Sequence, residues 1–364
     1  MANIFDYLND VAYDSFYDLP VNELDVLALT ELTYLPFDDV VAQEPKRLID
    51  LAPQIPRETT MLTNKNRLQL LDQLAQHKRF KNCKLSDFIN DIDPELQKQF
   101  AAMAYRISLD TYLLVFRGTD DSIIGWKEDF HMTYMKEIPA QKHALKYLQD
   151  FFAQHPNQKV VIAGHSKGGN LAVYAASQLD PLLQKNIVAV YTFDAPGLHK
   201  ELTETAGYQN MMERTKVFVP QGSIIGMMLE IPDKKIVVRS TALGGIAQHD
   251  TFSWQVADKH FIQLDETNSD SQQVDTTFKE WVETVPDEEL QLYFDLFFGI
   301  ILDAGISSIN DLSSFNAIEH IHQLFVQAQS LTPEERETMG RLTQLLIDTR
   351  YQAWKNRQST KKTF

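Results

Sequence analysis

The stretch VVIAGHSKGGNLAVYAA, residues 160–176, constrains the fold more than any other part of the chain. Four apolar residues run into Gly164-His165-Ser166-Lys167-Gly168, and a helix-like segment follows. A serine flanked by small residues, between a strand and a helix, is typical of a nucleophile elbow. The turn exposes the hydroxyl at the carboxyl end of a sheet and directs the next backbone N–H toward a developing oxyanion. The pattern predicts that Ser166 is a nucleophile and that Lys167 provides one oxyanion donor.

Short apolar runs alternate with helical patterns over the first 265 residues. Such alternation predicts an α/β fold with a mostly parallel sheet flanked by helices, of the α/β-hydrolase type. Apolar residues at helical spacing also predict amphipathic helices over residues 22–52. The first clear strand is expected at 111–118, and the later ones are expected at 159–164, 187–193, 216–220 and 236–240.

The pattern of alternating strands and helices ends after residue 265. The segment ETNSDSQQ, residues 266–273, is polar and resembles a linker, and the remainder favours helices without a strand. The sequence Thr332-Pro333-Glu334-Glu335 indicates the start of the last helix, with a capping Thr and a Pro at the first helical position. We therefore expect an α/β domain over 1–265, a linker over 266–273 and a helical region over 274–364.

The charge balance excludes several partner classes. The chain carries 34 basic and 50 acidic side chains, a formal net charge of −16. Such a surface repels phosphate backbones and anionic lipid headgroups, so neither nucleic-acid binding nor electrostatic docking to a membrane is expected. No stretch approaches 18 uncharged apolar residues, so stable membrane insertion is not expected either. Cys83 is the single cysteine, and the first residues lack the pattern of a secretory signal, so a cytoplasmic location is predicted. No metal-ligand spacing is present, and neither a metal nor another cofactor is expected.

A second motif lies upstream of the elbow, in LLVFRGTDDSIIGWKEDF, residues 113–130. A strand that ends at Phe116 and leads into Thr119 is placed to supply the second oxyanion donor, through the N–H or the hydroxyl of Thr119. Together the two segments resemble the class 3, fungal-type lipases. The chain is still more similar to a bacterial family of lipase-like proteins without an assigned function, over about residues 3–265. The resemblance implies an α/β-hydrolase fold, with Ser166 as nucleophile and with Thr119 and Lys167 at the oxyanion positions.

Lys167 departs from the pattern of the lipases, which usually have an apolar residue there. A lysine at the mouth of the site would favour an anionic or polar substrate over a neutral triglyceride.

The general base is expected on a loop that follows the last core strands. His249 follows the strand IVVRS and a flexible loop, which is the required place. His199 comes too early, and His260 falls in what the sequence suggests is a further helix. His165 precedes the nucleophile on an extended strand, so its ring is expected to pack beneath the turn.

The acid that would orient the histidine does not follow the pattern of the class 3 lipases. Class 3 lipases place an Asp after the strand that here reads KVFVP, but this chain continues with Pro220-Gln221-Gly222-Ser223. Asp194 closes the strand before, where pancreatic-type lipases take their acid, and we expect it to orient the base. Asp194 could instead only cap its own turn. Weaker alternatives are Asp250, Asp233 and Glu230.

The apolar stretch SIIGMMLEIP, residues 223–232, presents Ile224, Met227 and Met228. Such a segment either lines an acyl pocket or belongs to the core, and the sequence leaves both open.

Three functions are compatible with the sequence. The first is a serine hydrolase that cleaves carboxylic esters of lipid-like or other acyl substrates, with Ser166, His249 and Asp194 as its catalytic residues. The second is a decayed hydrolase scaffold whose C-terminal helices bind a protein partner that the sequence does not identify. The third keeps the three residues but acts on thioesters or peptides.

Overall fold

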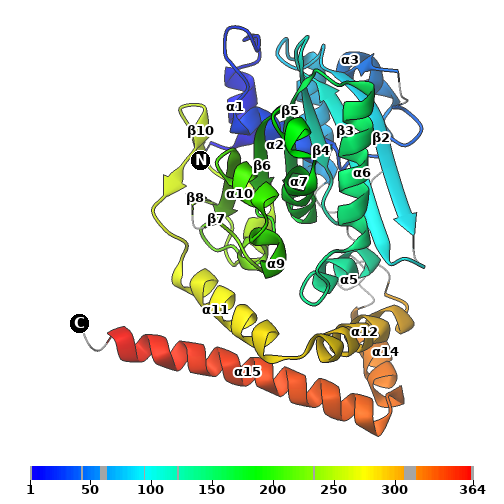
Figure 1. The fold of residues 1–364 in the computed structure, drawn as a ribbon, viewed down its shortest axis with the longest axis vertical. Coiled ribbons are helices and arrows are strands. Elements are labelled where there is room, and N and C mark those ends of the chain that lie inside the picture. Colours follow the sequence, from blue (N-terminus) through cyan, green and yellow to red (C-terminus); the bar gives the residue numbers. More distant parts are fainter. Residues whose placement is uncertain are drawn as a thin grey trace.

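A mixed sheet forms the centre of the computed structural model, which describes residues 2–41, 44–57, 64–93, 95–120, 123–232, 234–306 and 317–361. Within these ranges, nine strands form the sheet in the order β1-β2-β3-β4-β5-β6-β7-β8-β11 (Figure 1). Five consecutive strands run parallel, and all five were expected from the sequence: β4 (Thr111–Phe116), β5 (Lys159–His165), β6 (Ile187–Phe193), β7 (Thr215–Pro220) and β8 (Lys235–Val238). The predicted α/β class is confirmed.

The antiparallel half of the sheet was not predicted from the sequence. It consists of β1 (Lys46–Arg47), β2 (Lys84–Asp93) and β3 (Lys98–Arg106), with β11 (Gln263–Leu264) antiparallel to β8 at the other edge. Strand β3 is buried on both faces, so it has no alternating pattern. Strand β2 is polar and carries a register shift between Ser86 and Ile89. Neither strand has the period of two that identifies a half-buried strand.

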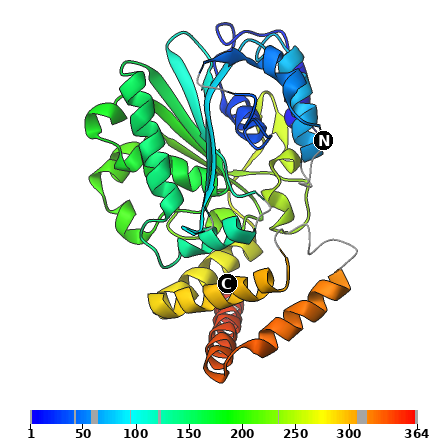
Figure 2. The ribbon, with the colours of Figure 1, turned by 90° about the vertical axis from the view of Figure 1, so that its right-hand side faces the viewer.

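Helices cover both faces of the parallel strands, as a parallel sheet requires (Figure 2). Alternate residues of β4 point to opposite sides: Leu113 and Val115 join one core, and Leu114 and Phe116 join the other. The first core also contains helices α1 (Ile4–Asp10), α2 (Glu23–Leu32), α3 (Leu48–Leu51) and α4 (Asn64–Gln76). The second is covered by α6 (Pro139–Gln154), α7 (Lys167–Gln178) and α10 (Ala206–Met212). Short helices α8 (Pro181–Gln184) and α9 (Lys200–Thr203) lie in the connections.

Helix α2 was expected to be amphipathic, and this prediction was wrong. All ten of its residues are buried. Each of its three buried acids has a partner from elsewhere in the chain: Asp25 pairs with Arg79, Glu31 pairs with Arg67, and Glu23 contacts the ring of His260. A helix that is buried all round needs such partners for its charges, because an unpaired buried carboxylate is costly.

The C-terminal helices lie below the carboxyl edge of the sheet in Figures 1 and 2. They are α11 (Ser269–Thr284), α12 (Asp287–Asp303), α14 (Ala317–Ser330) and α15 (Pro333–Lys361). Helix α11 begins inside the segment expected to be a linker, with Asn268 as its capping residue. At the start of α15, Glu335 N donates to Thr332 Oγ1 and Thr332 N donates to Glu335 Oε2, which is the predicted capping arrangement. Within the described ranges, no helix is long and apolar enough to cross a membrane.

His260 lies on a strand, not on the expected helix. It belongs to β10 (His260–Phe261), which pairs with β9 (Val256–Ala257) in a separate two-stranded sheet. Its Nδ1 lies 2.7 Å from Glu23 Oε1.

Candidate functional site

Ser166 lies on a sharp turn between β5 and α7. Its backbone has φ 56° and ψ −136°, a conformation that a non-glycine residue adopts only under strain. A Cβ on Gly164 would lie 2.1 Å from the backbone of Gly168, and a Cβ on Gly168 would lie 2.1 Å from Phe116 O. The two glycines are therefore needed because the chain doubles back on itself and on the end of β4. This is the geometry predicted for a nucleophile elbow.

The ends of the parallel strands bring the other predicted residues to the same edge. Phe116 is in register with Gly164, and His165 is in register with Phe193. The segments that follow β4, β5 and β6 therefore begin side by side, and they carry Thr119, Ser166 and Asp194 respectively.

Asp194 and His249 are joined by a hydrogen bond of 2.6 Å between Asp194 Oδ2 and His249 Nδ1. Asp194 is fully buried and has a positive φ of 44°. Its other oxygen, Oδ1, accepts from Ser223 Oγ at 2.5 Å and from Gly226 N at 3.1 Å. Three donors thus hold a buried carboxylate in one orientation, which leaves His249 Nε2 as the ring nitrogen that can serve a serine hydroxyl.

The loop that carries His249 is fixed at several points. His249 closes the 3₁₀ helix Ala247–His249, and Trp254 Nε1 donates to the carbonyl of the preceding Gln248 at 2.8 Å. The Gln248 side chain accepts from Gly222 N at 2.8 Å and donates to Ala242 O at 3.0 Å. The His249 ring also lies against the ring of His165, with 4.4 Å between centroids.

The predicted oxyanion residues lie where the ends of β4 and β5 meet. A Cβ on Gly118 would come within 3.0 Å of Ser166 Cβ, so the chain before Thr119 lies directly against the elbow. Thr119 Oγ1 donates to Asp129 Oδ2 at 2.7 Å. Burial raises the pKa of Asp129 to about 6, although the nearby Lys167 ammonium acts to lower it.

The expectation that Lys167 lies at the mouth of the site was wrong. Its side chain is fully buried, and Nζ lies 2.8 Å from Glu128 Oε2 on helix α5 (Ile123–His131). Burial acts to lower the pKa of Lys167, but the carboxylates of Glu128 and Asp129 raise it above its usual value. Glu128 also accepts from the backbone of Gln99 and Ala140. A lysine is accommodated at this buried position because its ammonium reaches the Glu128 carboxylate.

Loss of the Lys167 charge should destabilise the fold. We expect Lys167→Met to lower the free energy of unfolding by about 3–5 kcal/mol, because Glu128 would remain buried without its cation. Urea unfolding measures the loss. The matched control is Lys146→Met, which breaks an exposed pair with Asp150 and should cost at most about 0.5 kcal/mol. Equal losses for the two variants would contradict this account.

The C-terminal helices contact both sides of the site. On the acid side, Ser271 Oγ of α11 donates to Ser223 O at 2.5 Å, in the loop that holds Asp194. On the side of Thr119, Lys127 Nζ of α5 lies 2.7 Å from Asp295 Oδ1 of α12, and the rings of Phe130 and Phe294 are 4.8 Å apart.

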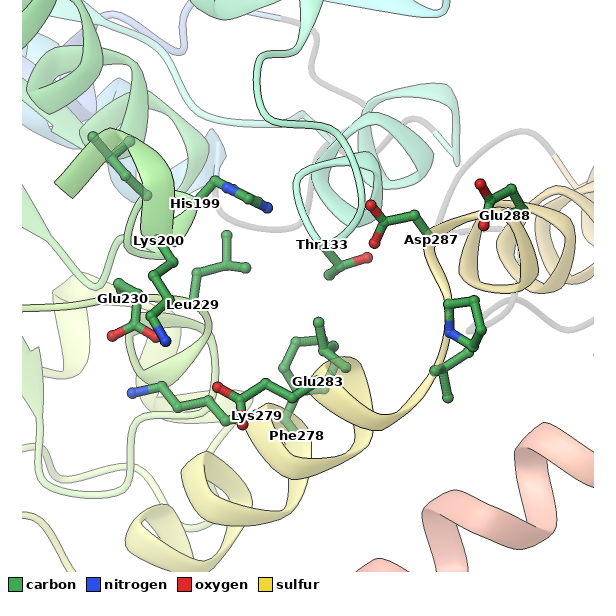
Figure 3. Close-up of a pocket in the computed structure, with 14 residues that line it drawn as sticks. Thr133, His199, Lys200, Leu229, Glu230, Phe278, Lys279, Glu283, Asp287 and Glu288 are labelled. Carbon is green, nitrogen blue, oxygen red and sulfur yellow. The ribbon is translucent and has the colours of Figure 1, made fainter. Parts of the chain in front are cut away.

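A cavity of about 490 Å³ lies between the α/β domain and helices α11 and α12 (Figure 3). Its apolar wall includes Leu229, Phe278 and Val282, and charged side chains surround it. Lys200 and Lys279 lie on the side of Glu230, and Asp287 and Glu288 lie across the cavity from them.

The apolar stretch 223–232 contributes to this cavity at its end. Leu229 and Glu230 line it, whereas the predicted pocket residues Ile224, Met227 and Met228 are not among the residues that do. Met227 and Met228 are buried, and the turn they belong to presents Gly226 N to Asp194. The role predicted for them in a substrate pocket stays a prediction.

The other candidate acids make no contact with the His249 ring in the described part of the chain. The Asp250 carboxylate accepts from Phe252 N, and Glu230 lines the cavity. Asp233 lies outside the described residues. His199 caps helix α9 and also borders the cavity.

Sequence reasoning missed Ser223, Glu128 and Tyr34, all of which contact the site. Ser223 lies in the loop after β7, where the sequence offers no carboxylate, and its hydroxyl binds Asp194 from the end of the neighbouring strand. In the sequence, the only sign of this arrangement is the lack of a carboxylate in that loop. Tyr34 lies two residues beyond the end of α2, and nothing in the sequence there indicated a contact with the site.

Several lipases are among the solved structures that are similar to part of this chain. Similar solved structures include a Rhizomucor miehei lipase propeptide complex (18% identity, 57% of this chain and 68% of that one, TM-score 0.35). Others are a mutant form of MDLA from Penicillium cyclopium (14%, 68% and 87%, TM-score 0.42) and lipase II from Rhizopus niveus (19%, 51% and 75%, TM-score 0.33). No curated protein matches the chain. A family model described as Mbeg1-like matches residues 74–299, more than half of the sequence, and the chain therefore belongs to the Mbeg1-like family.

Proposed function

We propose that this protein is a serine hydrolase that cleaves carboxylic esters of lipid-like or other acyl substrates. Ser166 is the nucleophile, His249 is the general base and Asp194 orients the base. The observation that carries the proposal is the 2.6 Å hydrogen bond between Asp194 and His249, beside a serine held at a φ of 56°. A buried acid, a histidine and a strained serine on neighbouring loops form the arrangement that activates a hydroxyl.

In the first half of the reaction, His249 Nε2 takes the proton of Ser166 Oγ while the oxygen attacks the ester carbonyl carbon. The tetrahedral intermediate carries its negative charge on the former carbonyl oxygen. Its collapse breaks the bond to the leaving alcohol, which receives the proton from His249. Water, activated by the same histidine, then cleaves the acyl-Ser166 ester and releases the acid. The proposal requires Ser166 Oγ to hydrogen-bond to His249 Nε2, a contact that commonly tightens only with substrate bound.

The oxyanion donors in this proposal are two backbone N–H groups. The N–H of Lys167 stands at the first position of α7, where a helix leaves its N–H groups without intrahelical partners. The hydroxyl of Thr119 is already used as a donor to Asp129, so its backbone N–H is the group assigned to the oxyanion. The contact with Asp129 then fixes how the Thr119 side chain lies.

Two features that favoured a decayed scaffold each have a physical reason that is compatible with activity. The missing acid after β7 is replaced by Asp194, which reaches His249. The unusual Lys167 is a buried partner of Glu128. Both observations support activity over decay.

The cavity beside α11 is proposed to receive the apolar part of the substrate. A panel of p-nitrophenyl esters with acyl chains of two to twelve carbons, with matched thioesters and anilides, tests both parts of the proposal. We expect esters to be turned over fastest. Val282→Trp, which fills the cavity, should raise KM for the longer esters by about tenfold, the effect of losing one to two methylenes of apolar burial, and leave acetate unchanged.

The control for this panel is Val326→Trp, at an exposed position of α14. It should leave every ester unaffected. Turnover of no ester would contradict the proposed reaction, whereas equal effects of Val282→Trp on short and long esters would contradict only the role of the cavity.

A further inference from the structure

A buried chain of hydrogen bonds runs beneath Ser166 and joins the oxyanion turn to the histidine loop. Gly118 N donates to Tyr34 Oη at 3.1 Å. Tyr34 Oη lies 3.1 Å from His165 Nδ1, and His165 Nε2 lies 3.0 Å from the carbonyl oxygen of His249. Tyr34 and His165 are both buried. The chain thus begins one residue before Thr119, passes the residue before the nucleophile and ends on the backbone of the base.

The direction of each bond follows from the groups present. A carbonyl oxygen only accepts, so His165 Nε2 must carry the proton that reaches His249 O. Burial lowers the pKa of His165 to about 4, and the ring is therefore neutral near pH 7, with Nδ1 as an acceptor. Tyr34 then accepts from Gly118 N and donates to His165 Nδ1. The Tyr34 hydroxyl also lies 3.5 Å from His165 O, but with a neutral His165 ring the shorter contact to Nδ1 is the one that requires its proton.

A second set of contacts, centred on Glu31, supports the same loops. Glu31 Oε1 accepts from Thr251 Oγ1 at 2.8 Å, two residues after His249. Glu31 Oε2 pairs with Arg67 at 2.9 Å, and the Arg67 guanidinium lies over the Tyr34 ring at 3.9 Å. Burial would raise the pKa of Glu31, but the Arg67 charge lowers it, so the carboxylate remains ionised.

The sheet alone does not fix the distance between the Gly118 turn and the His249 loop, which the hydrogen bonds connect. Strands β4 and β5 are neighbours, so the register holds Gly118 against Ser166. The His249 loop follows β8, which is separated from β5 by β6 and β7. A base must reach its nucleophile within hydrogen-bonding distance, and a displacement of about 1 Å can cost about 100-fold in rate.

We propose that Tyr34 and His165 are positioning residues that hold the oxyanion turn and the His249 backbone in fixed relation around Ser166. This inference rests on the proposed hydrolase function. Neither side chain is assigned contact with substrate. Both act through the backbone groups of Gly118 and His249.

Tyr34→Phe tests the inference, because it removes one oxygen and leaves the ring in place. We expect kcat for ester hydrolysis to fall by about 10- to 100-fold, with KM within about twofold of the wild-type value. The matched control is Tyr105→Phe. Tyr105 is also buried, and its hydroxyl lies 2.8 Å from Thr33 Oγ1, a partner outside the Gly118 turn and the His249 loop. The control should lose comparable stability and keep kcat within about twofold.

His165→Asn provides the second variant, since the shorter amide cannot span from Tyr34 to His249 O. The double variant Tyr34→Phe/His165→Asn should lose no more than the larger single effect, because both changes break one chain. If Tyr34→Phe does not fold, the kcat of His165→Asn is compared with that of Tyr105→Phe instead.

Three outcomes separate the inference from the function on which it rests. A wild-type protein without esterase activity contradicts the proposed function. An active wild type with equal kcat in Tyr34→Phe and Tyr105→Phe overturns the positioning role, as do fully additive losses in the double variant. A fall in kcat that is confined to the Tyr34 and His165 variants supports it.

Discussion

Replacing Ser166 with alanine is expected to lower kcat for ester hydrolysis by about 10⁴- to 10⁶-fold, because no acyl-enzyme can form without the hydroxyl. Initial rates with a short p-nitrophenyl ester measure the loss. Ser177→Ala is the matched control: Ser177 lies on the same helix α7, is also buried and makes no contact with the proposed catalytic groups in the part of the chain described. It should retain wild-type rates. A Ser166→Ala protein within tenfold of the wild type would place the reaction elsewhere.

Asp194→Asn is expected to lower kcat by about 10⁴-fold while the protein stays folded. Ser223 Oγ and Gly226 N both donate to Oδ1, so the amide of an asparagine would keep its oxygen there. Its NH₂ group would then face His249 Nδ1 as a donor, which requires Nδ1 to accept and moves the ring proton to Nε2. A histidine in that tautomer cannot take the serine proton.

Asp250→Asn is the control for this variant. Asp250 is adjacent to His249, and its carboxylate accepts from Phe252 N, a role that an amide oxygen preserves. We expect kcat within about threefold of the wild type, since the side chain takes no part in orienting the base. A larger loss in Asp250→Asn than in Asp194→Asn would reverse the assignment of the acid.

The features that could be predicted from the sequence are the ones that depend on residues close together in the chain. The elbow depends on consecutive residues, and the requirement for Gly164 and Gly168 can be read from spacing alone. The five parallel strands were also predicted, because each is a short apolar run between turn signals. Asp194 and His249 were chosen from their positions after strands, and the topology then brings them to the same edge.

The contacts that the sequence could not predict are long-range. Tyr34 reaches Gly118 across 84 residues, and Lys167 reaches Glu128 across 39. Lysine is rarely buried, so a surface position was the reasonable expectation for Lys167, and only the fold reveals the carboxylate that pairs with it. Strand β3 and helix α2 were missed or misjudged for a related reason. Both are buried on every side, which removes the periodicity that distinguishes a buried face from an exposed one.

The central claim is that Ser166 is an activated nucleophile, and a fluorophosphonate probe tests it most directly. Attack by an activated serine oxygen on phosphorus displaces fluoride and leaves a stable phosphonyl-serine, which mass spectrometry of the digested protein locates. We predict a single label on Ser166, absent from Ser166→Ala and strongly reduced in Asp194→Asn. A well-folded wild-type protein that takes up no label, or that carries it on a different residue, would contradict the claim.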